Sequence, residues 1–172
     1  MPEGLGRMRW FLLAACAAAA ADLATKALAE RALDPFVPIQ VLPFFDVRLG
    51  YNRGISFGLF PADSDGGVLL LAALTLGILG LVTALAWRAR AGVERVGYGL
   101  ILGGGLGNVV DRLGDGAVTD FLDAHLAGHH FPTFNMADVA ITFGVAALFW
   151  ATLLEAPVTA GGQADDPRRS TP

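Results

Sequence analysis

Residues 68–87 read VLLLAALTLGILGLVTALAW, twenty residues without a charged side chain. An α-helix rises about 1.5 Å per residue, so a helix of this length crosses the roughly 30 Å hydrocarbon core of a bilayer. In hydrocarbon every backbone N–H and C=O group needs a partner within the protein, and a helix provides one for each. This stretch therefore predicts a transmembrane helix and a membrane protein.

Three other stretches have the same character. The first runs from about Trp10 to Ala29, the third from about Val96 to Val110, and the fourth from about Asp138 to Leu154. The chain of 172 residues is 54% hydrophobic and 16% charged, with a mean hydropathy of +0.54, which excludes an ordinary soluble domain. Its net charge of −4, without a basic stripe, excludes a nucleic-acid partner. We expect an all-α membrane protein with four transmembrane helices in one domain, residues 1–156.

Small residues recur along the third stretch. Gly99, Gly103 and Gly107 follow one another at four-residue spacing. In membranes, helices approach most closely where small residues line the contact. The third helix is therefore predicted to pack tightly against another helix.

Arginines mark the cytoplasmic side of the membrane. They lie before the first stretch, between the second and third, and in the C-terminal tail: Arg7, Arg9, Arg88, Arg90, Arg95, Arg168 and Arg169. By the positive-inside rule both termini are then cytoplasmic, and residues 30–67 and 112–137 face outward. Residues 157–172, rich in Gly, Gln, Asp and Pro, are expected to form a disordered cytoplasmic tail.

The N-terminal stretch admits another interpretation. Arg7 and Arg9 followed by apolar residues resemble the start of a secretory signal peptide, and Leu13–Cys16 resembles a lipoprotein cleavage box. Only about six apolar residues precede Cys16, fewer than the apolar region of such a signal contains. A retained first helix is the better interpretation.

The composition changes between the first two stretches. Pro35, Pro38 and Pro43 interrupt a segment in which β-branched and aromatic residues partly alternate with others. Such content, bounded by glycines, is typical of short strands rather than of helix. We therefore predict a small extracytoplasmic β-sheet over about residues 35–60, between the first and second helices and on the membrane surface.

Two aspartates stand at the outward ends of apolar stretches. Asp111 follows the third stretch and Asp138 opens the fourth, each three residues after an asparagine, Asn108 or Asn135. A carboxylate beside hydrocarbon is costly, so such residues are functional candidates. Two adjacent carboxylates retain one proton between them and can serve as base and acid in peptide hydrolysis, with no metal required. We expect a catalytic pair, with Asp138 at a helix N-terminus as the base and Asp111 as the acid.

Five short motifs follow one another along the chain: DLATK at 22–26, NRGISFG at 52–58, GNVVDR at 107–112, VTDFL at 118–122 and FNMADVAI at 134–141. In this order, on four apolar stretches, they closely resemble the lipoprotein signal peptidases (signal peptidase II), bacterial four-span intramembrane aspartyl peptidases. The resemblance extends from about Arg9 to Leu154. The loop with His125, His129 and His130 has no place in this pattern.

The resemblance implies an aspartic endopeptidase that removes the signal peptide from diacylglyceryl-modified prolipoproteins, cutting just before the lipidated cysteine. It also implies a place in the bacterial cytoplasmic (inner) membrane, contact with membrane lipid, an active site toward the outer face, and no cofactor. Asp111 and Asp138 match the family's catalytic aspartates. The other motif positions near the site, substrate-binding or supporting, are Asp22, Lys26, Asn52, Gly54, Asn108, Arg112 and Asn135.

Several of these residues have purely structural interpretations as well. Asp22 and Lys26, four residues apart on a helix, can form a supporting ion pair. Asn108 and Asn135 can cap or pack helices, and Gly54 can belong to a turn. The sequence leaves these alternatives open.

Other chemistries are less well supported. His125 and His129 have the spacing of a helical metal pair but lack the accompanying glutamate. Ser56 and Lys26 could form a serine–lysine nucleophile pair, although nothing in their spacing brings them together. A proton-coupled transporter needs polar groups across the membrane, whereas Val68–Trp87 has no charge and the acids gather on one side.

Overall fold

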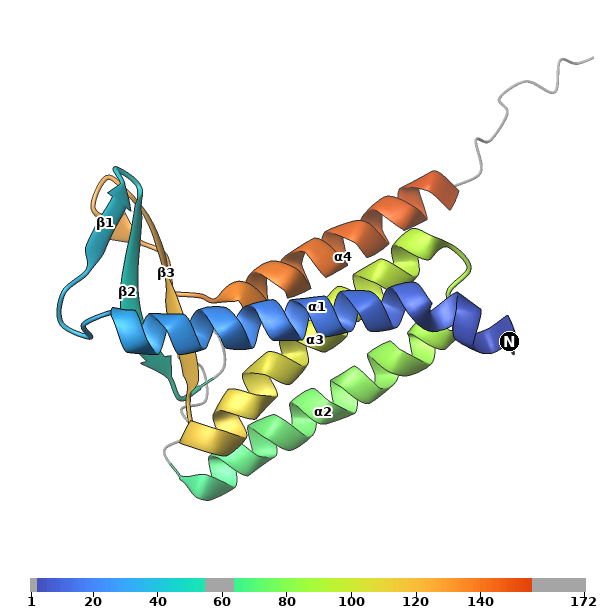
Figure 1. The fold of residues 1–172 in the computed structure, drawn as a ribbon, viewed down its shortest axis with the longest axis horizontal. Coiled ribbons are helices and arrows are strands. Elements are labelled where there is room, and N and C mark those ends of the chain that lie inside the picture. Colours follow the sequence, from blue (N-terminus) through green and yellow to red (C-terminus); the bar gives the residue numbers. More distant parts are fainter. Residues whose placement is uncertain (1–2, 55–63, 156–172) are drawn as a thin grey trace, which may run out of the picture.

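The computed structural model describes residues 3–54 and 64–155, which form a helix bundle with a small sheet at one end (Figure 1). The helices are α1 (Glu3–Ala32), α2 (Asp65–Arg88), α3 (Gly92–Asp115) and α4 (Met136–Glu155). The strands are β1 (Ile39–Leu42), β2 (Phe45–Asn52), β3 (Val118–Leu126) and β4 (His129–His130). A mostly helical membrane architecture with a small sheet is thus confirmed.

The helices extend beyond the apolar stretches because polar groups cap their ends. Ser64 accepts a backbone N–H at 3.2 Å and begins α2, and Glu94 accepts the N–H of Ala91 at 2.9 Å at the start of α3. Gly116 ends α3 in the left-handed conformation, with φ of 71°. Helix α3 continues to Asp115, so Asp111, which was expected at the end of the third stretch, lies on the last turns of α3.

Helix α3 contacts each of the other three helices. A side chain at Gly99 or Gly103 would collide with the backbone of α1, and a Cβ at Gly104 would lie 2.5 Å from the carbonyl oxygen of Ala137 on α4. Only glycine allows backbones to approach this closely. The tight packing predicted from the glycine spacing is confirmed, and it brings α1, α3 and α4 together at the end of the bundle that carries the sheet.

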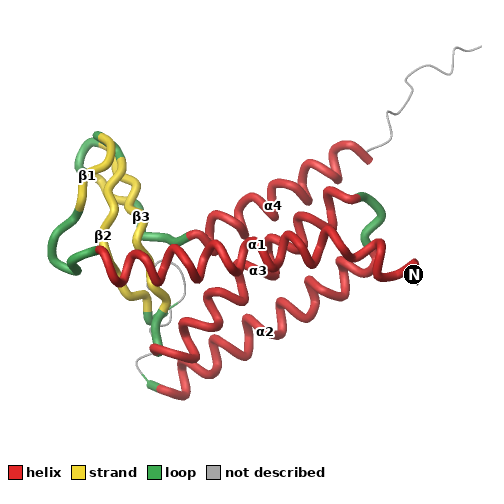
Figure 2. Tube along the Cα trace, viewed as in Figure 1, coloured by secondary structure: helices red, strands yellow, loops and turns green. Residues whose placement is uncertain are grey.

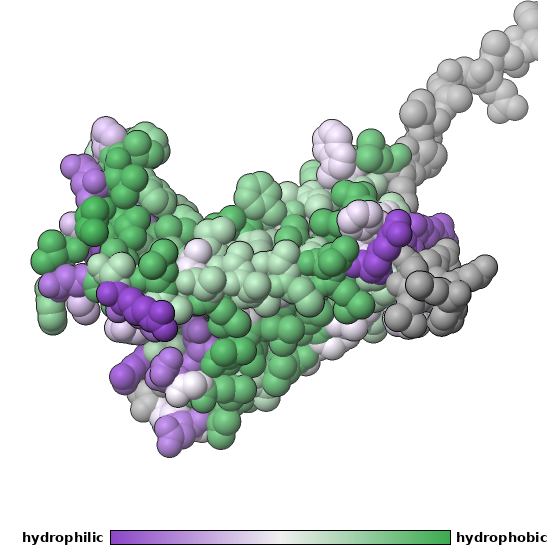
Figure 3. Space-filling model, in the orientation of Figure 1, coloured by the Kyte–Doolittle hydropathy of each residue, from purple (hydrophilic) through white to green (hydrophobic). Residues whose placement is uncertain are grey.

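The outer surface of the bundle is apolar. By length and composition, three of the described helices are able to cross a membrane, namely α1 from Met8, α2, and α4 as far as Leu154. Figure 3 shows apolar residues over the bundle and polar residues mainly toward its two ends. Large apolar side chains such as Leu69 and Phe149 are exposed there, as expected where lipid is the solvent. The chain is a multi-pass membrane protein.

The sheet is antiparallel, with strand order β1–β2–β3–β4 (Figure 2). β1 and β2 come from the segment predicted to form strands, of which residues 55–60 lie outside the described residues. β3 and β4 come from segment 112–137, where no strand was predicted, so the predicted segment supplies two of the four strands. The first four residues of β3 are all buried, and a strand of this kind lacks the alternation that identifies strands in sequence.

Apolar contacts join the sheet to the end of α1. Ala29, Leu49 and Phe121 are buried together, with further apolar residues of the sheet and of α4 packed around them. The register of β2 against β3 places Gly50 opposite Asp120. This packing holds the first half of β3 beside the ends of α3 and α4.

Candidate functional site

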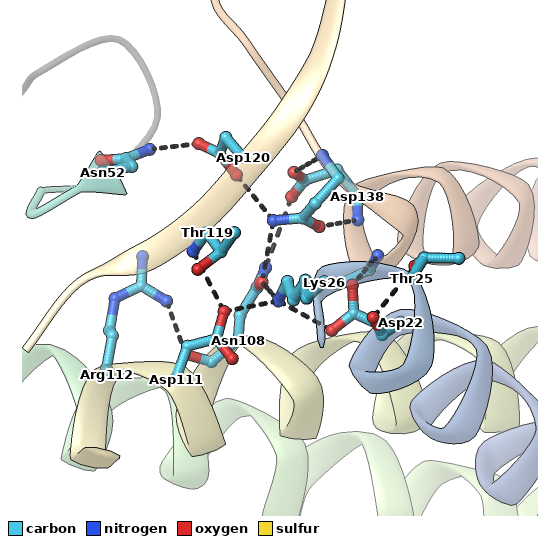
Figure 4. A network of polar contacts seen from close by, with 12 residues as sticks. Asp22, Thr25, Lys26, Asn52, Asn108, Asp111, Arg112, Thr119, Asp120 and Asp138 are labelled. Carbon is cyan, nitrogen blue, oxygen red and sulfur yellow. Dashed lines mark hydrogen bonds and ion pairs between the residues drawn. The ribbon is translucent and has the colours of Figure 1, made fainter. Parts of the chain in front are cut away.

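The expected site residues lie in one polar network where α1, α3, α4, β2 and β3 meet (Figure 4). The structure brings together residues from all five motifs. The hydrogen bonds that join them connect residues up to 115 positions apart in the chain. The expected residues found there are Asp22, Lys26, Asn52, Gly54, Asn108, Asp111, Arg112, Asn135 and Asp138.

Lys26 occupies the centre of this network. Its Nζ lies 2.7 Å from Oδ2 of Asp22 and 2.9 Å from Oδ2 of Asp111, and it donates to Oδ1 of Asn108 at 2.9 Å. The lysine is 2% exposed, and Asp22 is fully buried. A buried charge is tolerated only when it is paired and hydrogen-bonded. The predicted Asp22–Lys26 ion pair is present, and Asp111 extends it from α1 to α3.

Asp22 connects three helices. Its Oδ1 accepts the backbone N–H of Ala137 at 2.8 Å, at the start of α4. On the opposite side the carboxylate touches α3, where a side chain at Gly107 would collide with it. The glycine therefore allows Asp22 to reach both Lys26 and α4.

Asn135 and Asp138 form the N-terminal cap of α4. The N–H of Asp138 donates to Oδ1 of Asn135 at 3.1 Å, and the N–H of Asn135 donates to Oδ2 of Asp138 at 3.1 Å. This reciprocal pair is a capping box, which explains why α4 begins here. The amide of Asn135 also donates to Asn108 at 3.2 Å and to Asp120 at 2.7 Å. Asn135 therefore both caps α4 and belongs to the polar network.

Asp120 is the acidic residue of the network to which the sequence assigned no role. It lies on β3, is 3% exposed, and accepts hydrogen bonds from the amides of Asn135 at 2.7 Å and Asn52 at 3.2 Å. Burial raises the pKa of Asp120 to about 6, the negative charge of Asp138 acts in the same direction, and the two amides and Lys26 oppose them. An aspartate inside the largely apolar motif VTDFL was the available sequence signal.

Asp111 has a different environment. Its Oδ2 is bound by Lys26 and also accepts the N–H of Thr119 at 3.1 Å. The hydroxyl of Thr119 donates to Glu30 at 2.7 Å, so the residue that precedes Asp120 is held by α1 and α3 together. Sequence reasoning missed Thr119 and Glu30, because their contact depends on the position of β3.

A cavity of about 730 Å³ opens beside this network. Its polar end is formed by Asn52, Asn108, Arg112, Asp120 and Asp138. The rest of its wall comes mainly from β3, the segment 131–134 and the first turns of α4. Among the described residues, Asp120 and Asp138 are the two carboxylates that line it. Asp111 is not among the residues that line the cavity. It is linked to Asp138 through Lys26, which donates to Oδ1 of Asn108, and through the amide of Asn108, which donates to Asp138 at 3.4 Å.

Arg112 connects the cavity to the end of β2. Its Nη2 donates to the carbonyl oxygen of Gly54 at 3.1 Å, and its Nη1 donates to that of Asn108 at 3.2 Å. The N–H of Gly54 donates to Oδ1 of Asn52 at 3.0 Å, which forms an Asx turn. The turn interpretation of Gly54 is correct, and the turn also places Asn52 against Asp120.

The three histidines lie outside this network. His125 is on β3 opposite His130 on β4, and His129 lies opposite Leu126. The spacing of His125 and His129 would place both on one face of a helix, but this segment is a hairpin. Within residues 3–54 and 64–155 no three His, Cys, Asp or Glu side chains are arranged to hold a metal ion. Ser56 lies outside the described residues.

Known proteins match most of this chain. A family model described as signal peptidase (SPase) II matches residues 14–154. A lipoprotein signal peptidase of Nitrobacter hamburgensis is 42% identical over 123 residues, covering 69% of this chain and 75% of that protein. Another, of Rhizorhabdus wittichii, is 44% identical over 129 residues, 74% of this chain and 72% of that protein. A third, of Francisella tularensis subsp. novicida, is 37% identical over 150 residues, 86% and 92% of the two chains.

The fold is also similar to two solved structures described as bacterial membrane enzymes, determined by the in meso method at 2.3 Å and 1.9 Å. Their TM-scores are 0.76 and 0.73, at 25% and 27% sequence identity. The matches cover 90% and 86% of this chain and 94% of each of those chains. The resemblance seen in the five motifs is thus confirmed along nearly the whole chain. This protein belongs to the signal peptidase II family.

Proposed function

We propose that this protein is the aspartic endopeptidase that removes the signal peptide from diacylglyceryl-modified prolipoproteins, cutting just before the lipidated cysteine. Membership of the signal peptidase II family and relatives named lipoprotein signal peptidase support removal of signal peptides from prolipoproteins. The observation that carries the mechanism is the pair of carboxylates, Asp120 and Asp138, at the polar end of an otherwise largely apolar cavity.

In this proposal Asp120 replaces Asp111 as the partner of Asp138. Asp120 and Asp138 reach the same cavity, and Asn135 donates to both, to Asp120 from its side-chain amide and to Asp138 from its backbone N–H. Oδ2 of Asp111 is bound by Lys26, which also pairs with Asp22, and by the N–H of Thr119. We assign Asp111 a positioning role, because it fixes the start of β3 from which Asp120 projects.

The surroundings of the two carboxylates favour different roles. Burial and the charge of Asp138 raise the pKa of Asp120 to about 6, so Asp120 retains a proton more readily than an ordinary aspartate and serves as the acid. Asp138 stands in the first turn of α4, where the helix N-terminus favours a negative charge, and serves as the base. In this proposal Asp138 keeps the role of base expected from the sequence, and Asp120 takes the role of acid that was expected for Asp111.

The reaction then needs no covalent intermediate. The carboxylate of Asp138 takes a proton from a water molecule, whose oxygen bonds to the scissile carbonyl carbon while protonated Asp120 donates to the carbonyl oxygen. When the tetrahedral intermediate collapses, the C–N bond breaks and the leaving nitrogen receives the proton held by Asp138. At the same time one of the two hydroxyl groups of the intermediate returns its proton to Asp120, which leaves the carboxylic acid product and restores the starting state of the pair.

Neighbouring groups are suited to hold the substrate. Arg112 and Asn52 line the polar end of the cavity and have donors near the two carboxylates, where backbone carbonyls of an extended peptide would lie. The apolar wall provides a surface for the lipid-bearing part of the substrate. The sheet carries both Asn52 and Asp120 and so positions peptide and catalytic acid together.

We further propose that α3 is a fourth transmembrane helix and that both termini lie in the cytoplasm. Helix α3 has 24 residues and contacts the other three helices, so its polar groups are shielded from lipid by its neighbours. The arginines at the ends of the helices opposite the sheet support a cytoplasmic location for that side. The site then lies near the outer face of a bacterial inner membrane.

Purified protein in detergent, incubated with a diacylglyceryl-modified prolipoprotein, tests the activity. Mass spectrometry should find a product that begins at the modified cysteine. The same prolipoprotein without the lipid is the control and should remain uncut. Cleavage at another bond, or equal cleavage of both substrates, would contradict the proposed function.

A further inference from the structure

The outer half of the sheet carries a second cluster of charged side chains, apart from the catalytic network. It consists of Asp46 and Arg48 on β2, Asp123 and His125 on β3, and His130 on β4. These five residues, here called the outer cluster, connect three strands. None of these five residues is among those that line the cavity.

Asp123 is the buried centre of the outer cluster. It is fully inaccessible, whereas its partners Arg48 and His130 are 44% and 46% exposed. Nε of Arg48 lies 2.9 Å from Oδ2 of Asp123, and Nδ1 of His130 lies 2.9 Å from Oδ2 and 3.0 Å from Oδ1. Because a buried carboxylate is stable only when paired, Asp123 holds both partners against the sheet.

The register across the strands makes this pairing necessary. Asp46 stands directly opposite Asp123 in the β2–β3 pair, and like charges in this position are destabilising. His125 lies 3.2 Å from Asp46, and its ring lies 4.8 Å from the ring of His130. Each aspartate thus has a histidine as neighbour, and the histidines belong to the two strands of the β3–β4 hairpin.

This hairpin leads directly into the wall of the cavity. Residues 131–134 follow β4 and line the cavity together with Ala124 of β3. The inner end of this segment is fixed, because Phe134 exchanges backbone hydrogen bonds with Leu122 at 2.9 Å and Asn135 caps α4. Within residues 3–54 and 64–155, the backbone bonds that hold its outer end are those of the two-residue strand β4 and one from the N–H of Phe131 to the carbonyl oxygen of Ala124 at 2.7 Å.

We infer that Asp123, with Arg48 and His130, is a positioning residue that sets the outer end of the cavity wall and so determines how tightly the apolar part of the substrate is bound. This inference rests on the proposed function, because the substrate is the lipidated prolipoprotein. Loss of the pairing releases the outer end of residues 131–134, while the bonds that place Asp120 and Asp138 remain. Substrate binding then weakens, whereas the rate of the chemical step is unchanged.

The test compares His130→Ala, His130→Asn and Asp123→Asn with the wild type on one lipidated prolipoprotein peptide. His130→Ala and Asp123→Asn should raise KM about tenfold with kcat unchanged, since each removes a hydrogen bond to a charged group. His130→Asn should restore most of the wild-type KM, because its amide nitrogen can take the place of Nδ1. His129→Ala is the matched control, since His129 is the adjacent exposed residue and its side chain has no hydrogen bond or ion pair within the described part of the chain.

Hydrogen exchange gives a readout that does not depend on cleavage. Amides of residues 124–134 should exchange faster in His130→Ala than in the wild type, and amides of α4 should not. An unchanged KM together with unchanged exchange would overturn the inference, and so would a fall in kcat at constant KM. If the wild type cut no prolipoprotein, the proposed function would fail, while the exchange result would still decide whether Asp123 anchors the hairpin. If Asp123→Asn does not fold, the two His130 variants carry the test.

Discussion

Replacing Asp120, Asp138 and Asp111 one at a time by asparagine separates the catalytic carboxylates from the positioning one. Asparagine keeps the shape of the side chain but cannot donate or accept the transferred proton. General acid–base catalysis contributes about a hundredfold to ten-thousandfold to a rate. Asp120→Asn and Asp138→Asn should each lower kcat by an amount in that range, because both line the cavity in which the peptide is cut.

Asp111→Asn should act mainly on stability. Asn can still accept the N–H of Thr119, but it loses the ion pair with Lys26, whose side chain is 3% exposed. Breaking a buried ion pair costs about 3–5 kcal/mol, and the lower end applies because Lys26 keeps Asp22 at 2.7 Å. For a chain of this size a loss of about 3 kcal/mol lowers Tm by roughly 6–12 °C.

The assay is single-turnover cleavage of a lipidated prolipoprotein, measured together with Tm in the same detergent. Asp115→Asn is the control, because this exposed aspartate lies on the last turn of α3 outside the catalytic network. Asp111→Asn should retain substantial turnover below its Tm. The assignment would be refuted if Asp111→Asn abolished turnover at unchanged Tm while Asp120→Asn remained active, and Asp111 would then be the partner of Asp138.

Three further predictions follow from the same structure. The pKa of Asp120 is raised from 3.8 to about 6, so between these pH values Asp120 binds more protons in the folded than in the unfolded state. The free energy of unfolding should therefore fall by up to about 3 kcal/mol as pH rises from 4 to 6, and Asp120→Asn should abolish this slope in denaturation curves. A cysteine at His129, in a background without the native cysteine, should react with a membrane-impermeant thiol reagent applied from outside, whereas one at Arg90 should not; the reverse result would invert the topology. Gly107→Ala should lower both Tm and cleavage, because its Cβ collides with the carboxylate of Asp22, whereas Gly77→Ala on α2, where a Cβ meets nothing within 4 Å, should lower neither.

The sequence alone predicts the helices well because lipid imposes one simple constraint. Any segment that crosses hydrocarbon must be apolar and about 20 residues long, and Val68–Trp87 satisfies both conditions. The glycine spacing of α3 likewise requires close packing against a neighbour, which the structure confirms. These are properties of single segments, and no knowledge of the partner is needed to derive them.

The ends of the helices and the second half of the sheet depend on neighbours. Helix α3 continues past Asp111 until Gly116 ends it in the left-handed conformation, which an apolar pattern does not reveal. β3 is recognisable as a strand only beside β2, because its first residues are buried and carry no alternation. For this reason the sequence predicts the first half of the sheet but not the second.

The motifs in the sequence identify the acidic residues of the site, but only tertiary structure decides which of them act together. Asp111, Asp120 and Asp138 all belong to quoted motifs, and each stands beside apolar residues. Lys26, eighty-two positions away from Asn108 in the chain, reaches across to α3 and forms an ion pair with Asp111. The pairing of β3 with β2 turns Asp120 toward Asn52 and into the cavity of Asp138. The chemistry of a carboxylate is set by the charges and the solvent around it, and those come from distant segments that only folding brings into contact.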